Sequence, residues 1–390
     1  MLNEQISKLK NINKIEEKAP FIIIKKDKKL TNEELKFEDN KNPIILLHYI
    51  SLVKILSAFS VVILHTNGIG VYWNFKNKYE IYKHYFISAN LIECILNFAV
   101  PLFFLCIGAT LLGFNKRYGL KIYFIKRINK VAIPLLSWNI ILYFYKVYVL
   151  KNQKKIKFTF EELWNLYYGN KIYNIFGSIH SFILVYLIIP LLAFVEESKK
   201  IKIYSYCFIT LFITQVLIPY LIKIFHLNLV LIYQIKIGHL IYIFGGYIIH
   251  HYRFHYFYKI IIYLIGVVGL LILSFGTKIL TIRYKKTIIL HKGYLNFPCM
   301  VYSCSLFLFI KDNCYLLFRI INKKYINKIG SLTMGSFFLH FPLIDTYIKY
   351  FKINKLSLKF RLFDGFFICC ICLIITYIFK KIPLIKYLVP

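Results

Sequence analysis

The sequence is short of acidic residues. Its 390 residues include only 17 Asp and Glu against 51 Lys and Arg, so the formal net charge is +34. In a soluble protein such a balance would suggest a nucleic-acid partner. Here the basic residues lie in short clusters between apolar runs, where the cations of membrane proteins reach lipid headgroups. We therefore expect membrane lipids as partners and no nucleic acid.

The sequence also lacks the motifs of several common enzyme classes. The nine cysteines form no pair of CxxC motifs and no His–Cys metal spacing, so they indicate apolar filler in reduced form and no metal site. No Walker-type glycine loop, GxSxG elbow or HExxH motif occurs. Residues 1–43 mix lysine with acids and have no apolar core long enough for a signal peptide, so we interpret them as a polar cytoplasmic tail.

Apolar residues dominate the rest of the chain. They make up 58% of the sequence, and charged residues only 17%. Backbone amides cannot stay unpaired in lipid, so the long apolar runs must be helices. We predict an all-α, polytopic integral membrane protein in which residues 44–390 form one membrane-embedded domain of about ten transmembrane helices. The predicted spans are residues 44–65, 91–114, 131–150, 181–195, 203–223, 229–250, 259–275, 295–310, 329–347 and 362–379.

The orientation follows from the most basic connection. Six cations lie between the second and third predicted spans: Lys116, Arg117, Lys121, Lys126, Arg127 and Lys130. Short loops rich in Lys and Arg stay on the cytoplasmic side. We therefore expect a multi-pass protein of the plasma membrane with both termini in the cytoplasm.

Lys54 and His65 share the first predicted span. Eleven positions separate them, about three turns and about 16 Å, so both side chains fall on one helix face. Ionisable side chains are costly in lipid, and such a stripe places a cation near one membrane surface and an imidazole deeper in the membrane or at its far side. The alternative is structural: Lys54 reaches the headgroups and His65 ends the helix at the interface.

Two further candidates lie elsewhere in the chain. His340 is in the middle of the span 329–347, where it either bonds to another helix or lines a cavity. Arg127 and Lys130 are one turn apart at the entry to the third span, so together they could hold a phosphate. Equally, these two cations could only anchor the helix at the inner membrane surface.

Four stretches in this order resemble the acyltransferase 3 family of bacterial membrane acyltransferases. Residues 51–65 are similar to its first-helix pattern of arginine, ten residues and histidine, and residues 100–108 to its VPLFFxxSG motif. Residues 126–138 are similar to its basic entry to the third helix, and residues 329–343 to its SxGIYxxHxP helix. The resemblance covers nearly the whole chain after the tail.

The chain departs from the family pattern at several positions. Lys54 replaces the family arginine, which keeps the charge and loses the planar bidentate fork. Ile107 stands in place of a serine, and Phe337 in place of a tyrosine three residues before His340. The HLWF motif of the family near the fourth helix is degraded as well. Because the apolar spans are intact, these departures leave the membrane scaffold unchanged. They bear instead on the efficiency of the protein or on its substrate.

The resemblance implies transfer of an acetyl group from acetyl-CoA to a hydroxyl of a cell-envelope polysaccharide or lipid-linked sugar. His65 would be the general base, or would carry the acyl group covalently, and Lys54 would hold a donor phosphate or support developing negative charge. His340 would orient His65 or the acceptor, and Arg127 with Lys130 would bind the phosphates of coenzyme A. A transporter for a glycan or an anionic substrate is the alternative, since intramembrane cations and histidines also line transport paths.

The predicted orientation can be tested with reporter fusions. Fusions after residues 116–130 and after residues 196–202 should report a cytoplasmic location, and fusions within residues 66–90 an external one, because cationic loops stay inside. An external signal from a fusion near residue 122 would overturn the topology.

Overall fold

The computed structural model describes residues 43–68, 79–151, 159, 176–227, 238–285 and 288–389. Within these ranges every regular element is a helix and no strand occurs, so the all-α prediction is confirmed. The predicted tail lies outside the described residues except for Pro43, which begins the first helix.

The described residues form fourteen α-helices. In chain order they are α2 (Pro43–Thr66), α4 (Tyr79–Leu96), α5 (Ala99–Leu111), α6 (Leu120–Arg127), α7 (Ile133–Phe144), α9 (Phe176–Ala193), α10 (Glu197–Leu211), α11 (Ile218–Ile224), α12 (Leu240–His251), α13 (Tyr256–Leu271), α14 (Thr277–Tyr284), α15 (Phe297–Ile320), α16 (Lys323–Phe351) and α17 (Gly365–Lys381). Short π-helical stretches continue several of them without a break: η3 (Ile128–Ala132), η4 (Tyr145–Leu150), η5 (Phe212–Leu217), η6 (Ile272–Gly276) and η7 (Phe360–Asp364). Two 3-10 turns are η2 (Phe114–Lys116) and η8 (Ile385–Tyr387).

Seven stretches of the described chain are long and apolar enough to cross a membrane. They are His48–Thr66, His84–Lys116, Leu120–Leu150, Glu197–Ile224, Tyr256–Tyr284, Phe297–Ile320 and Phe360–Lys381. Seven of the ten predicted spans fall on these stretches, and the chain is therefore a polytopic all-α membrane protein.

The other three predicted spans fall on helices outside this set of seven. The run 181–195 lies on α9, whose 18 residues measure about 27 Å at 1.5 Å per residue, close to a hydrocarbon core of about 30 Å. The described part of the run 229–250 is the 12-residue apolar helix Leu240–His251. The run 329–347 lies within the longer α16, which also carries polar residues at both ends.

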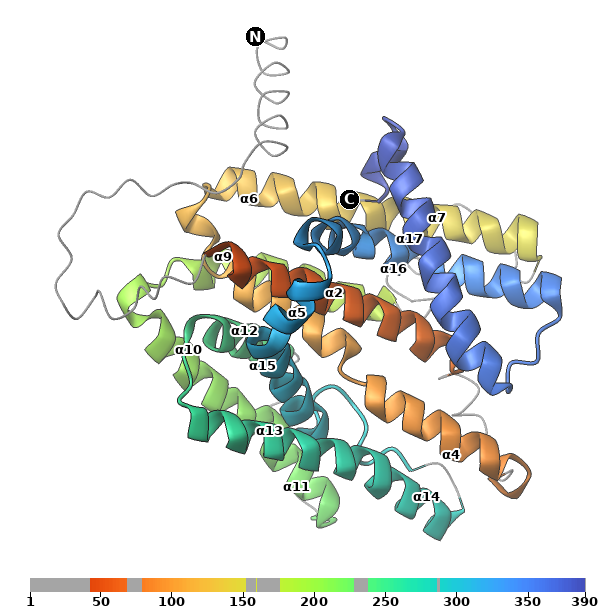
Figure 1. Cartoon of the computed structure of the whole chain (residues 1–390), viewed down its shortest axis with the longest axis horizontal. Coiled ribbons are helices and arrows are strands. Elements are labelled where there is room, and N and C mark those ends of the chain that lie inside the picture. Colours follow the sequence, from red (N-terminus) through yellow and green to blue (C-terminus); the bar gives the residue numbers. More distant parts are fainter. Residues whose placement is uncertain are drawn as a thin grey trace. The chain divides into compact units, whose positions relative to one another are not determined.

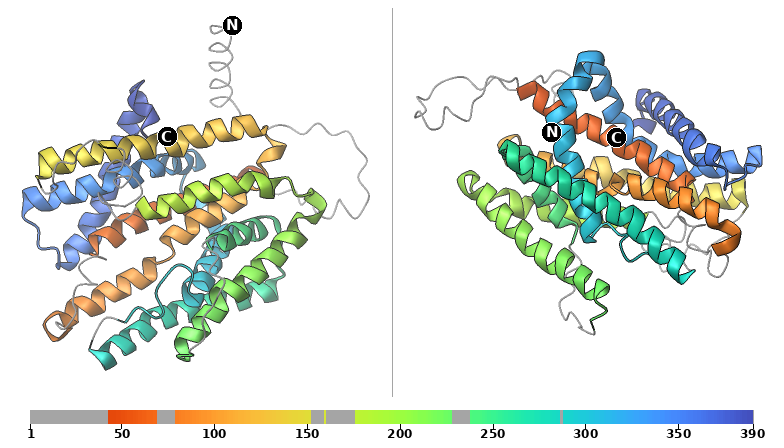
Figure 2. Two further views of the ribbon diagram at one scale, coloured as in Figure 1. Left: turned by 180° about the vertical axis from the view of Figure 1, so that it is seen from behind. Right: turned by 60° about the horizontal axis from the view of Figure 1, so that its bottom comes forward.

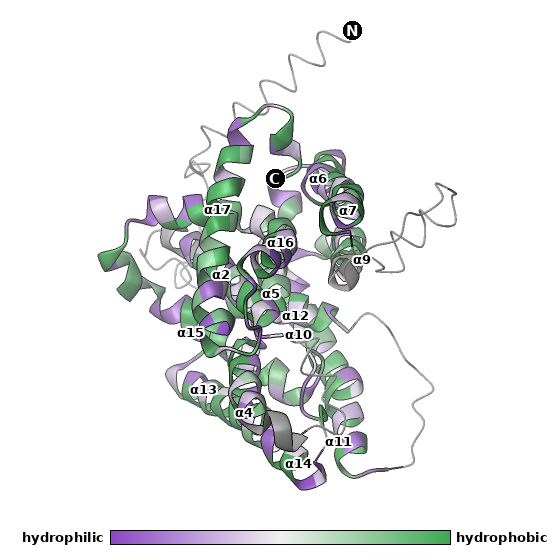
Figure 3. Ribbon diagram, turned by 90° about the vertical axis from the view of Figure 1, so that its right-hand side faces the viewer, coloured by the Kyte–Doolittle hydropathy of each residue, from purple (hydrophilic) through white to green (hydrophobic). Residues whose placement is uncertain are grey.

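The faces of α13 and α17 that point away from the other helices are apolar, as the green ribbon of Figure 3 shows. Large hydrophobic side chains are exposed there: Leu264, Val267 and Val268 on α13, and Phe366, Phe367 and Ile374 on α17. In water such surfaces would be costly, whereas lipid chains solvate them without penalty. The surface thus agrees with the membrane assignment.

The helix α5 packs closely against α12 near the centre of the molecule. A Cβ atom at Gly108 would lie 1.9 Å from the carbonyl oxygen of Ile243, and one at Gly246 would lie 2.0 Å from that of Leu105. Glycine at both positions lets the two backbones touch, as small residues do between membrane helices.

This central pair lies between two outer groups of helices. In Figure 1 and in the left view of Figure 2, α6 and α7 run along one edge and α13 and α14 along the opposite edge, with α2 and α5 between them. On the side of α6, α16 packs against α17. Residues far apart in sequence on α2, α5, α6, α16 and α17 thereby meet in one region.

The close contact of α5 and α12 predicts a sharp cost for an added methyl group. Gly246→Ala should lower the free energy of unfolding by about 1–3 kcal/mol, because a Cβ would overlap backbone atoms that cannot rotate away. Gly113→Ala is the matched control, since a Cβ there meets nothing within 4 Å. Thermal unfolding in detergent would measure both, and equal melting temperatures would contradict the packing role.

Candidate functional site

Two histidines from different helices lie against each other with their rings tilted. His65, at the end of α2, and His340, in the middle of α16, have ring centroids 5.2 Å apart with an interplanar angle of 31°. His340 is fully buried, and its Nδ1 lies 3.2 Å from the carbonyl oxygen of Ser336. Because a carbonyl only accepts, Nδ1 carries the proton and Nε2 keeps a lone pair. Among the described residues Nε2 has no hydrogen-bond partner.

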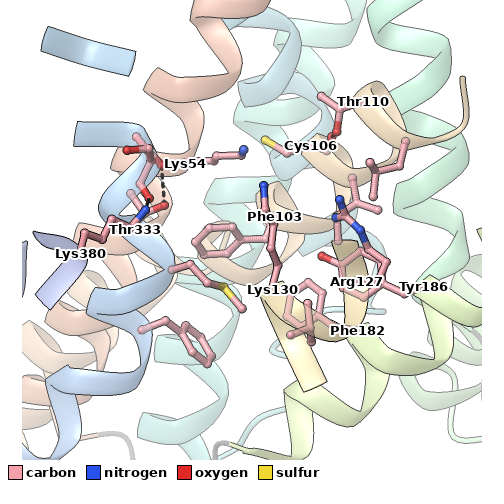
Figure 4. A pocket seen from close by; sticks show the side chains of 17 residues that line it. Lys54, Phe103, Cys106, Thr110, Arg127, Lys130, Phe182, Tyr186, Thr333 and Lys380 are labelled. Carbon is pink, nitrogen blue, oxygen red and sulfur yellow. Dashed lines mark hydrogen bonds between the residues drawn. The ribbon is translucent and has the colours of Figure 1, made fainter. Parts of the chain in front are cut away.

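A cavity of about 400 Å³ lies between α2, α5, α6, α9, α16 and α17. One face of α5 lines it, at positions three and four residues apart: Phe103, Cys106, Ile107, Thr110 and Leu111. Figure 4 shows Lys54 and Lys380 on one side of this cavity and Arg127 with Tyr186 on the other.

The cavity is strongly cationic. Four basic side chains line it, namely Lys54, Arg127, Lys130 and Lys380, and no acid is among the described residues of its wall. Each cation comes from a segment remote in sequence from most of the others, so the folded chain concentrates their charge. Low-dielectric walls focus such a field, and the cavity is therefore suited to an anionic ligand.

Two of these cations are held by neutral groups. The guanidinium of Arg127 lies 5.4 Å from the ring centroid of Tyr186 and 5.7 Å from that of Tyr123, while its buried Nε has no hydrogen-bond partner among the described residues. Lys380 Nζ donates to the carbonyl oxygen of Ser331 at 2.8 Å. Rings and carbonyls orient the charge without neutralising it, so both cations remain able to bind an anion.

The five residues singled out from sequence fall into two groups. Lys54, Arg127 and Lys130 line the cationic cavity together, a meeting that the sequence spacing of 54 and 127 did not show. His65 and His340 form the adjacent histidine pair, and neither is among the residues that line the cavity. The two groups are joined through α2, which carries both Lys54 and His65, and through α16.

Sequence reasoning missed two basic residues of this region, Lys380 and Arg361. In the sequence, Lys380 is one of several lysines that follow the last apolar run, and such lysines usually lie at the membrane surface. Arg361 was placed just before that run, yet only 2% of it is exposed. A lone arginine at the start of an apolar run is the signal that could have pointed to a buried role.

Arg361 ties the end of α2 to the start of the last helix. Its Nη1 lies 3.3 Å from Oδ1 of Asn67, its Nη2 lies 2.7 Å from Oγ of Ser88, and its guanidinium lies 4.5 Å from the ring centroid of Tyr85. In return Thr66 Oγ1 donates to the carbonyl oxygen of Arg361 at 3.0 Å. Because Thr66 and Asn67 directly follow His65, these bonds fix the backbone that carries the imidazole.

A family model described as an acyltransferase domain matches residues 47–381 of the chain. The chain belongs to the acyltransferase 3 family. The matched range includes all the residues of the cationic cavity and of the histidine pair. The family resemblance of the four sequence stretches is therefore confirmed. No curated protein and no solved structure matches the chain.

Membership in this family makes the protein a membrane acyltransferase. Its residues can be compared with what acyl transfer requires: a proton acceptor, a cationic pocket for the donor and a space that excludes water. In the described structure, the adjacent histidines His65 and His340 are candidates for the proton acceptor, and the cationic cavity is a candidate for the donor pocket. Those residues contain no cluster of three or more His, Cys, Asp or Glu that could hold a metal ion.

Proposed function

We propose that this membrane acyltransferase moves an acetyl group from acetyl-CoA to a hydroxyl of a cell-envelope polysaccharide or lipid-linked sugar at the plasma membrane. The observation that carries this proposal is the cationic cavity, with no acid among its described lining residues, close to a pair of adjacent histidines of which His340 is buried. The acyl donor is anionic and the acceptor hydroxyl must lose a proton, so the two features match the two reactants.

The cavity would hold the donor through its phosphates. Arg127 offers a planar fork of donors with an unused Nε, and such forks bind phosphate oxygens in pairs. Lys54, Lys130 and Lys380 supply further positive charge around the same space. The turn that carries Arg127 and Lys130 belongs to the segment predicted to face the cytoplasm, where coenzyme A thioesters are made.

His65 would be the base in the transfer step. Its imidazole takes the proton of the acceptor hydroxyl while the oxygen attacks the thioester carbonyl, and the resulting tetrahedral intermediate collapses to an ester. The coenzyme A thiolate leaves and receives the proton from His65, so the products are the acetylated acceptor and free coenzyme A. Lys54 would support the negative charge that develops on the donor side.

His340 would act through His65. Its Nδ1 is fixed by the carbonyl of Ser336, and its ring lies against the other imidazole, so it restricts the rotation of His65. A covalent acyl-imidazole on His65 would use the same arrangement, with the acetyl group passing first to the ring and then to the hydroxyl.

The donor site gives one prediction. Replacing Arg127 and Lys130 together with glutamine should weaken acetyl-CoA binding by about 1–3 kcal/mol, because charge-assisted hydrogen bonds to phosphate are lost. The matched control replaces Lys121 and Lys202, which are exposed and outside the cavity wall. Calorimetry with purified protein in detergent would measure both. Unchanged acetyl-CoA affinity in the first variant would make Arg127 and Lys130 topology anchors only.

The histidine and lysine of α2 give another prediction. His65→Ala should reduce acetyl transfer about 10²–10⁴-fold, as loss of a general base does. Lys54→Ala should also lose activity, whereas Lys54→Arg should retain it because the charge is kept. Mass spectrometry of acetylated envelope glycan in cells that carry each variant would measure transfer, with the exposed His84→Ala as control.

The same experiment separates transfer from transport. If the His65→Ala variant acetylates glycan at nearly the wild-type level, His65 only ends the helix at the membrane interface and has no role in catalysis. No acetylation by the wild-type protein, together with altered glycan export in the Lys54 and His65 variants, would favour the transporter instead.

A further inference from the structure

The end of the cationic cavity that faces the histidines is walled by two phenylalanines, Phe103 and Phe337. Phe103 comes from α5 and Phe337 from α16, and both line the cavity. Both also pack against the small apolar cluster of Val61, Leu64 and Ala99. Val61 and Leu64 lie on α2 between Lys54 and His65, so the two rings stand between the cation and the imidazole.

Phe337 links the cavity to the histidine pair directly. Its ring centroid lies 5.9 Å from that of His340, with an interplanar angle of 61°. Among the residues that line the cavity, no other has a described ring contact with His65 or His340. Phe337 therefore lies beside the cavity and against His340 at once, and a group that extends from the cavity toward His340 along this ring contacts it.

The chemistry of transfer puts the acyl chain at this wall. The acceptor oxygen must lie within hydrogen-bond reach of a histidine and about 3–3.5 Å from the thioester carbon. With the donor phosphates among the cations, the thioester points toward the histidines and its acyl chain lies against Phe103 and Phe337. A rigid aromatic wall limits the number of methylenes that fit, since packed walls do not yield to added volume.

We propose that Phe103 and Phe337 set the acyl-chain length of the donor and restrict it to a short acyl group. The inference rests on the proposed transfer from an acyl-CoA and names the residues that choose the acyl group. The limit on acyl-chain length comes from steric exclusion by the two phenyl rings. Replacing a phenyl ring by a methyl group opens room for several carbon atoms, and a pocket discriminates about tenfold or more per methylene.

The test compares acetyl-, propionyl- and butyryl-CoA with the full-length protein in proteoliposomes that also contain envelope glycan from the source cells. Free coenzyme A is quantified by chromatography with mass spectrometry, which avoids thiol reagents that would react with the cysteines of the chain. In Phe337→Ala the ratio of kcat/KM for butyryl-CoA to that for acetyl-CoA should rise by about tenfold or more. Phe103→Ala should shift the ratio in the same direction.

Two variants serve as controls. Phe182→Ala removes a phenyl ring from the same cavity, but Phe182 comes from α9 and stacks on Phe104 instead of packing between the cation and the imidazole. Its chain-length ratio should stay at the wild-type value. Phe337→Tyr keeps the ring and should also keep the preference for acetyl, which shows that position 337 tolerates substitution.

Binding measurements separate failure of this inference from failure of the proposed function. Acyl-CoA affinities of the His65→Ala background, with and without Phe337→Ala, give the chain-length preference without turnover. A longer-chain preference in binding, with no coenzyme A released by the wild type, would support the wall and overturn the transfer reaction. The same acyl preference in wild type and in folded Phe337→Ala, in both binding and turnover, would overturn the wall.

Discussion

A positive charge inside a membrane protein is costly unless something compensates it, and this constraint shapes the site. At two buried lysines elsewhere in the described chain the compensation is an acid: Lys292 lies 2.5 Å from Glu93, and Lys200 pairs with Glu197. Around the cavity Arg127 rests on tyrosine rings and Lys380 on a carbonyl, and neither pairs with a described acid. An anionic ligand would neutralise these two charges, and for this reason the cavity is suited to binding and is not a structural ion-pair network.

Two helices organise the chemistry. The first, α2, carries Lys54 at the cavity and His65 about three turns further on, and α16 carries Phe337 beside the cavity and His340 one turn further on. Residues on one helix keep their spacing, so the proposed donor site and the proposed base, His65, are held at a fixed separation along α2. The bonds of Arg361 to Asn67 and Ser88 then fix the end of α2 against the rest of the bundle. Proton transfer requires such rigidity, because a shift of about 1 Å can cost about 10²-fold in rate.

The contact between α5 and α12 holds α5 in place on the side of α5 away from the cavity. Gly108 and Gly246 let the backbones meet, so α5 cannot slide or tilt without a clash. The opposite face of α5 then presents Phe103, Cys106 and Thr110 to the cavity. The glycine of the VPLFFxxSG-like stretch therefore has a packing role, whereas the residue before it, Ile107, lines the cavity where the family has a serine. This substitution makes the wall more apolar and leaves the cationic side unchanged.

The sequence by itself determined the class of the protein. Long apolar runs can only be helices in lipid, and eleven positions between Lys54 and His65 are enough to put both on one helix face. The helix ends were not determined in this way, because apolar composition does not reveal where a helix stops, and α16 extends beyond the apolar run 329–347 at both ends. Only the tertiary structure decided that Lys54 shares a cavity with three other cations, Arg127, Lys130 and Lys380. It also decided that His340 lies against His65 and that Arg361 is buried. These facts depend on contacts between helices remote in the chain, and periodicity within one helix carries no information about which neighbour its face will meet.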